Sequence, residues 1–322
     1  MPRLTQLDDI LFPVEEHPVF VSAYADTKER RIPVPNKKAL VNTRNYRVLG
    51  VVSRDYRLVT NREALNLAYQ CCVTVFPETK PGEWQVEASD APQTGGHCFI
   101  DLSHNTTALD FSLVQAADRP DVFGPFIRVT NSYNGLRALG FDIGYHRKVC
   151  KNGMILPQSI ISFKFDHMKK DIKEQIVFQV DNKTIAVFKT QFNDYFTGLK
   201  KCKIPRDCFE PLIGGVLCIR EPKNVNNGPG SLRQDWQVLN KNLKELSDRY
   251  FVELGDNAYA AFNAITDFAS HPPDNQCIHR ERNSMQRLAG HWLSTFHLEC
   301  QKDDFQISSY LAELAKENAS MN

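Results

Sequence analysis

Hydrophobic and polar residues alternate between Leu139 and Cys150 with the period of two that is typical of a β-strand. One face carries Leu139, Phe141, Ile143, Tyr145 and Val149, and the other carries Gly140, Asp142, Gly144, His146, Lys148 and Cys150. The pairs Asn134-Gly135 and Asn152-Gly153 stand on either side and favour hairpin turns, because Asn-Gly readily adopts positive φ. The pattern therefore predicts a strand meander whose polar face is open to a ligand, a nucleic-acid strand or a packed helix.

The residues before this meander predict a hairpin, a helix and further strands. β-rich runs over residues 46–52 and 56–59 precede Thr60-Asn61-Arg62-Glu63, which matches a capping box and predicts the start of a helix. The apolar stripe of that helix would pack on the hairpin; it consists of Ala64, Leu65, Ala68, Cys71 and Cys72. Short β-like runs continue over residues 84–111 and 126–130.

After Pro157 the hydrophobic spacing changes to that of amphipathic helices. The apolar positions with this spacing are Phe188, Phe192, Tyr195, Phe196 and Leu199, then Trp236, Leu239, Leu243, Leu246 and Tyr250, and finally Ala258, Phe262, Ile265 and Phe268. Residues 221–231 are rich in asparagine, glycine and proline and predict a break between subdomains.

These patterns predict an α+β fold, with a mainly antiparallel sheet, flanking helices and a helical C-terminal subdomain. Residues 1–35 contain five prolines and predict an irregular N-terminal arm. An α+β sheet domain is expected over residues 36–220, and the helical subdomain over residues 232–322.

Composition places the 322-residue chain among ordinary soluble proteins, with 42% hydrophobic and 24% charged residues. The net charge of +1 gives no overall attraction to nucleic acid or to an anionic membrane, so any such binding must come from a local patch. No leader pattern or membrane-length apolar run is visible, and we expect a cytoplasmic protein without a membrane partner. Nine irregularly spaced cysteines favour reduced thiols over a disulfide scaffold.

Residues 136–173 form a basic segment, with eight basic against three acidic residues and hence a local charge of +5. Aromatic residues are interleaved with these charges, as in grooves that track a phosphate backbone and stack bases. The candidate nucleic-acid contacts are Tyr133, Arg137, Arg147, Lys148 and Lys151. A solvated surface would use the same lysines and arginines, and this alternative stays open.

Other polar residues suggest further chemistry at the sheet turns, where the candidates are Asn131, Asp142, His146, Cys150 and Asn152. Cys150 lies beside basic groups that could activate a thiol, although a small buried cysteine is the commoner case. Asn263, Asp267 and His271 share one helix face and could form an acid–base site, or could equally serve capping and helix–helix hydrogen bonds. No common metal-site spacing or cofactor-binding motif is present, so no metal or cofactor is expected.

Several motifs together resemble the phage/plasmid-like protein family, a prokaryotic domain of unknown function, number nine-three-two. They are Leu49-Gly50-Val51-Val52-Ser53-Arg54-Asp55-Tyr56, Asn61-Arg62-Glu63-Ala64-Leu65, Asn131-Ser132-Tyr133-Asn134-Gly135, Arg147-Lys148-Val149-Cys150-Lys151-Asn152-Gly153, His167, and Asn263-Ala264-Ile265-Thr266-Asp267 with His271. The resemblance covers about residues 45–295. It implies a protein carried by phages, plasmids and prophage islands, often among genes for DNA metabolism and anti-restriction.

Three functions remain open from the sequence. The leading hypothesis is an accessory protein that binds nucleic acid during replication, recombination or annealing, with single-stranded DNA as the expected ligand. The second is a protein-binding factor whose partner is a host or phage protein, for example in a defence or restriction system. The third is an uncharacterised enzyme with its polar site at the sheet turns. A positive groove would favour the first function, and an exposed apolar patch the second. A deep pocket in which Asp142, His146 and Arg147 converge would favour the third.

Overall fold

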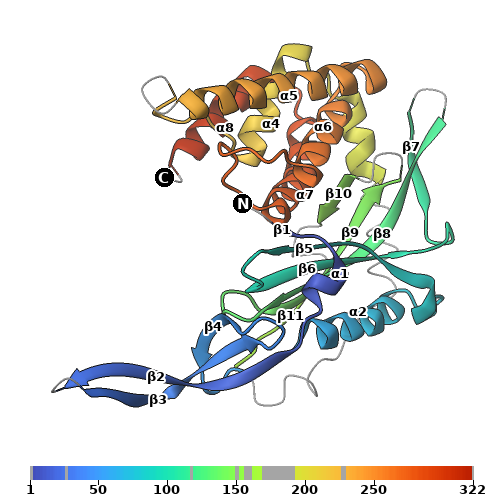
Figure 1. Cartoon of the computed structure of the whole chain (residues 1–322). Coiled ribbons are helices and arrows are strands. Elements are labelled where there is room, and N and C mark those ends of the chain that lie inside the picture. The colour runs from blue at the N-terminus through green and yellow to red at the C-terminus, as the bar shows by residue number, and fades with distance from the viewer. Residues whose placement is uncertain are drawn as a thin grey trace. The chain divides into compact units, whose positions relative to one another are not determined.

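The computed structural model describes residues 3–25, 28–116, 119–148, 152–155, 162–168, 193–225 and 230–320 (Figure 1). These residues form two compact units, each built from several stretches of chain. Unit 1 takes the described residues within 1–106, 126–143 and 161–181, and unit 2 takes those within 107–125, 144–160 and 182–322. Two long strands, β8 (Arg119–Ser132) and β9 (Leu139–Arg147), contribute residues to both units.

A three-stranded antiparallel sheet occupies the N-terminal part of unit 1, in the order β2-β3-β4. Its strands are β2 (Val14–Ala25), β3 (Lys28–Asn42) and β4 (Arg47–Ser53). The prediction of an irregular arm over residues 1–35 was therefore wrong. Three of its prolines lie in strands, Pro18 on the edge strand β2 and Pro33 and Pro35 in the part of β3 that β4 does not reach, and such positions tolerate a missing N–H donor.

A second antiparallel sheet of unit 1 follows the order β1-β5-β6-β8-β9, and β11 also pairs with β9. Its other strands are β1 (Arg3–Leu4), β5 (Trp84–Pro92), β6 (His97–His104) and β11 (Ser162–Phe165). The short helix α1 (Leu7–Ile10) and the 3-10 turn η1 (Pro81–Glu83) lie between strands. Helix α2 (Asn61–Val75) begins at the predicted Thr60–Glu63 capping box, and its predicted apolar stripe is buried.

Unit 2 is mainly helical. Strand β7 (Phe111–Ala116) pairs with the first part of β8, and β10 (Asn152–Ile155) pairs with the last part of β9. Residues 193–201 are helical, and the elements that follow are η2 (Arg206–Cys208), α4 (Phe209–Leu217), α5 (Gly230–Leu254), α6 (Ala258–Ser270), α7 (Arg282–Glu299) and α8 (Ile307–Ser320). Helix α6 contacts α4, α5 and α7, and almost all of its residues are buried.

The α+β class, the antiparallel pairing and the helical C-terminal region are confirmed. The expected domain limits differ from the structure, because unit 2 also takes strands and helices that precede residue 221. None of the helices within the described ranges is both long and apolar enough to cross a membrane.

Two details of the predicted meander also need correction. Every residue of β9 is buried, so its polar face is covered and not open. The turn at Asn134-Gly135 is confirmed, with Gly135 at φ +73° between β8 and β9. Asn152 and Gly153, however, lie within β10 opposite Arg147 and His146, so they are strand residues and not the centre of a turn.

Candidate functional site

Tyr133 and Asn131, at the end of β8, belong to a buried hydrogen-bond network of unit 1. The Tyr133 hydroxyl accepts from the backbone N–H of Asn61 at 2.7 Å, and Asn131 Nδ2 donates to Val59 O and Asn61 Oδ1 at 2.8 Å each. Tyr133 is fully buried, and burial raises its pKa well above the ordinary value. This placement contradicts the stacking role predicted for Tyr133, since its ring has no exposed face.

Gly50 is the point at which the Leu49–Tyr56 motif and the Asn131–Gly135 motif come into close contact. A Cβ atom at Gly50 would lie 2.6 Å from both Tyr133 O and Asn134 Cα, closer than any real side chain approaches. Only glycine lets the backbone that follows β8 cross β4 at this distance. The Tyr56 hydroxyl donates to Ser132 O at 2.6 Å beside the same crossing.

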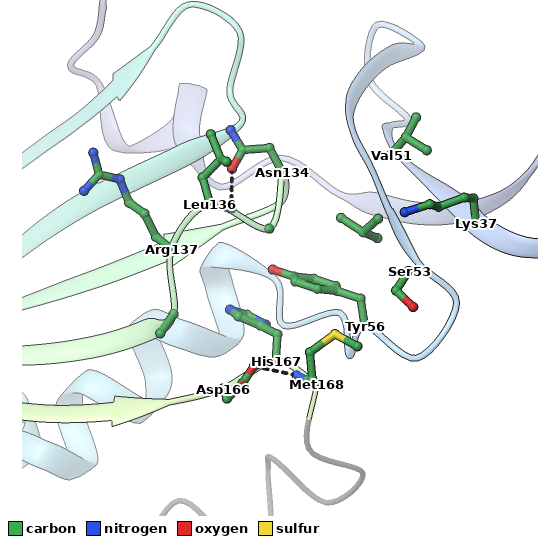
Figure 2. A pocket seen from close by; sticks show the side chains of 13 residues that line it. Lys37, Val51, Ser53, Tyr56, Asn134, Leu136, Arg137, Asp166, His167 and Met168 are labelled. Carbon is green, nitrogen blue, oxygen red and sulfur yellow. Dashed lines mark hydrogen bonds between the residues drawn. The ribbon is translucent and has the colours of Figure 1, made fainter.

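A cavity of about 350 Å³ opens in unit 1 next to this crossing (Figure 2). It is lined by Lys37 of β3, residues 51–53 of β4, Tyr56, the turn at 134–138 and residues 166–168. The Tyr56 ring stacks on His167 with their centroids 4.6 Å apart. His167 therefore forms part of the wall of the cavity, although the residue is almost completely buried.

The protonation of His167 follows from its hydrogen bonds. Its Nδ1 lies 3.0 Å from Arg57 O, and a carbonyl oxygen only accepts, so Nδ1 carries the proton. Nε2 is then an acceptor, and it has no hydrogen-bond partner in the described part of the chain. Burial lowers the pKa of His167, which keeps the imidazole neutral.

The charged groups around the cavity are few and mixed. Lys37 is exposed on one side, and the Asp166 carboxylate accepts from the Met168 backbone N–H at 2.9 Å on the other. The Arg137 guanidinium points away from the cavity and stacks over the Phe99 ring, 5.1 Å from its centroid. The predicted contact Arg137 is thus half-buried and held by an aromatic ring of β6.

In unit 2, Arg147 is an internal residue. It is 2% exposed, its Nε donates to Asp121 Oδ1 at 2.8 Å, and its Nη2 donates to Glu253 Oε1 at 2.9 Å. The Tyr259 hydroxyl donates to the other oxygen of Asp121 at 2.6 Å. This placement contradicts the predicted phosphate contact of Arg147, because two carboxylates already neutralise the guanidinium. Lys148 pairs with Asp110 at 3.1 Å.

The remaining candidates lie in different parts of the two units, and Asp142, Asn263 and Asp267 form hydrogen bonds inside their own unit. Asp142, in unit 1, accepts from Ser162 Oγ at 2.8 Å, and His146, in unit 2, is buried. On α6, Asn263 Nδ2 donates to Tyr259 O at 2.8 Å. Asp267 binds Arg249, Tyr250 and His271, which is the helix–helix bonding that the sequence left open. Asn152 lies in β10, and Cys150 and Lys151 lie outside the described residues.

The sequence analysis missed a stronger basic segment in unit 1. Residues 30–57, which include most of β3 and all of β4, contain eight basic residues and one acidic residue, a net charge of +7. We call this segment the basic hairpin; its basic residues are Arg30, Arg31, Lys37, Lys38, Arg44, Arg47, Arg54 and Arg57. A count of local charge would have found it, since +7 exceeds the +5 of residues 136–173.

Unit 1 and unit 2 together define an α+β protein with a basic antiparallel hairpin and a polar cavity. The chain belongs to the family described as a domain of unknown function (DUF932), whose pattern it matches over residues 48–292. No curated protein and no solved structure matches the chain. Within the described ranges, no group of three or more histidine, cysteine, aspartate or glutamate side chains is arranged to hold a metal ion.

Proposed function

We propose that this protein binds nucleic acid through the basic hairpin of unit 1. The observation that carries the proposal is its charge of +7 over 28 residues in a chain of net charge +1. Electrostatic attraction to phosphates supplies most of the affinity in sequence-independent nucleic-acid binding, and it needs such a local concentration of cations.

The cations of the basic hairpin are accessible. Apart from Lys38, which pairs with Glu16 at 2.7 Å, each of them is exposed. Five of them form no ion pair with a carboxylate in the part of the chain that the structure describes: Lys37, Arg44, Arg47, Arg54 and Arg57. Arg44 and Arg47 donate to the backbone oxygens of Asp8 and Gln93, which orient these guanidinium groups without neutralising them.

Tyr46 supplies an aromatic surface among these charges. It lies between Arg44 and Arg47 in the turn that joins β3 to β4, and it is 83% exposed. Its φ of +56° is uncommon for any residue other than glycine. An exposed ring between two arginines suits stacking on a base or a sugar, which supports the proposed interaction.

A role in replication, recombination or annealing on phage or plasmid DNA fits such binding, because these processes handle nucleic acid of many sequences. The basic hairpin also accounts for binding better than residues 136–173 do. Arg147 is bonded internally, and Lys148 pairs with Asp110.

Exposed apolar side chains on the same sheet support a second candidate function, the binding of a host or phage protein. Five apolar residues of β2, β3 and β4 are about half exposed: Phe20, Val21, Ile32, Val48 and Val51. Exposed apolar side chains that lie near one another are typical of protein-binding sites. A protein that binds nucleic acid through the cations can bind a protein through these residues.

Fluorescence anisotropy with labelled oligonucleotides over a range of salt concentrations tests the proposal. We expect the Arg44→Ala/Arg47→Ala variant to bind more weakly, and the slope of log K against log salt to flatten by about 1.4 to 1.8, since each of the two lost phosphate contacts contributes about 0.7 to 0.9. Lys37→Ala/Arg54→Ala, whose side chains make no described ion pair, should behave similarly and checks that misfolding is not the cause.

The matched control is Lys241→Ala/Lys244→Ala, which removes two exposed cations of α5 and should leave the slope almost unchanged. Wild-type protein that shows no salt-sensitive binding to any oligonucleotide at low ionic strength would contradict the proposal and favour the protein-binding function.

A further inference from the structure

The outer half of β2 and β3 is a two-stranded ribbon. Six residue pairs join the strands there, from Phe20 opposite Pro33 to Ala25 opposite Lys28. Among the described strands, β4 pairs with β3 only over Lys37–Asn42, so this part has no third strand. Figure 1 shows β2 and β3 extending away from the rest of unit 1. We call the paired residues Phe20–Ala25 and Lys28–Pro33 the ribbon.

Both faces of the ribbon carry exposed apolar and cationic side chains. Val21 and Ile32 lie opposite each other and are 53% and 52% exposed, and Phe20 is 50% exposed next to them on the other face. Arg30 and Arg31 are adjacent in a strand, so their side chains point to opposite faces, and both are exposed. An isolated two-stranded ribbon is only marginally stable in water, and about half of the surface of each of these apolar side chains stays exposed. These side chains therefore suit contact with a partner on both faces.

We propose that the ribbon inserts into the major groove of B-form DNA while the basic hairpin contacts the adjacent phosphates. The proposal rests on the proposed function and names its substrate class. The major groove is about 12 Å wide and admits a two-stranded ribbon, whose strands are about 4.8 Å apart before side chains are added. Six residues per strand give the ribbon a length of roughly 20 Å, which spans about six base pairs.

The charges of the ribbon and of the rest of the basic hairpin indicate which segment does what in the proposed complex. The ribbon carries Lys28, Arg30 and Arg31 against Glu29, a net charge of +2, whereas residues 34–57 of the basic hairpin carry a net charge of +5. Most of the attraction therefore comes from residues 34–57. The ribbon fits the width of the major groove and contacts the base edges in it. Arginines reach guanine edges or phosphates, and apolar side chains such as Val21 and Ile32 contact thymine methyl groups.

Comparison of a DNA duplex, an RNA duplex and single-stranded DNA of equal length tests this inference. The major groove of A-form RNA is too deep and narrow for side chains to enter. We therefore expect wild-type protein to bind the DNA duplex at least about tenfold more tightly than the RNA duplex, because only the major groove of DNA admits the ribbon.

A shortened variant, in which Asn-Gly replaces residues 21–32, should lose this preference and bind the two duplexes equally. A milder variant, Val21→Ser/Ile32→Ser, keeps the ribbon and should reduce the preference in the same direction. Arg44→Ala/Arg47→Ala serves as the comparison, because it should weaken binding to all three nucleic acids and leave the preference unchanged.

Three results would overturn the inference. The first is equal binding of wild-type protein to both duplexes, which leaves the proposed function intact. The second is a preference that survives in the shortened variant. The third is a shortened variant that loses self-association, measured by sedimentation, while its nucleic-acid binding stays unchanged; the ribbon would then bind a second copy of the chain. Binding to none of the three nucleic acids would overturn the proposed function as well.

Discussion

Gly50 shows how one residue without a side chain determines the packing of unit 1. We expect Gly50→Ala to lower the free energy of unfolding by about 2 kcal/mol or more, because its Cβ would overlap the backbone at Tyr133 and Asn134. Gly82→Ala is the control, since its Cβ would meet nothing within 4 Å. Equal thermal stability of the two variants would contradict the close crossing of β4 and the chain after β8.

His167 makes the stability of the protein depend on pH. Burial lowers its pKa in the folded state, so the unfolded chain takes up the proton first as pH falls through the ordinary value of 6.5. The free energy of unfolding should therefore fall as pH decreases from about 7.5 to about 5. Urea denaturation of wild-type protein and His167→Gln should show a shallower dependence in the variant. His297, whose pKa burial also lowers, contributes with the same sign in both proteins.

Identical pH dependence in the two proteins would mean that His167 is not held neutral. His297→Gln is a suitable second comparison, because it should leave the contribution of His167 in place.

At the residue scale, the sequence identified which side chains could carry chemistry but not what surrounds them. Arg147 and Tyr133 were assigned to a nucleic-acid surface because they are basic and aromatic. The partner of Arg147 is Asp121, which stands 26 positions away, and no local pattern connects them. The partner of Tyr133 is a backbone N–H 72 positions away. Burial through such distant contacts follows from the tertiary fold.

At the scale of elements, local signals gave good predictions where the structure is locally determined. The capping box at Thr60 begins α2, the apolar spacing of α5 gives a buried stripe, and the predicted apolar residues of α6 are buried together with most of that helix. Proline content misled the prediction for β2 and β3, because edge and two-stranded positions accept proline. The polar face of β9 is buried because a strand inside a sheet can be covered on both sides.

The network around Arg147 joins β8, β9, α5 and α6 of unit 2, and it should contribute strongly to stability. We expect Arg147→Met to cost about 3 to 5 kcal/mol, because it leaves the buried Asp121 carboxylate without its cation. Lys241→Ala breaks an exposed pair with Glu245 and should cost less than about 1 kcal/mol. Urea denaturation measures both values, and a similar small loss in the two variants would argue against a buried pair.

At the scale of the whole molecule, a net charge near zero conceals a strong separation of charge. The basic hairpin carries +7 and the total is +1, so the rest of the chain carries −6. Whole-chain composition therefore gives no sign of the basic hairpin, and the local charge of residues 136–173 points to Arg147, which is bonded internally. The exposure of the hairpin cations, and the internal bonding of Arg147, became visible only once the strands were placed.

Photo-cross-linking to a labelled oligonucleotide, followed by mass spectrometry of the cross-linked peptides, tests the central claim most directly. The account predicts that cross-links concentrate within residues 30–57, with Tyr46 among the modified residues, because this exposed ring lies between Arg44 and Arg47. The Arg44→Ala/Arg47→Ala variant should lose most of them. Cross-links that concentrate in unit 2, with none in the basic hairpin, would contradict the account.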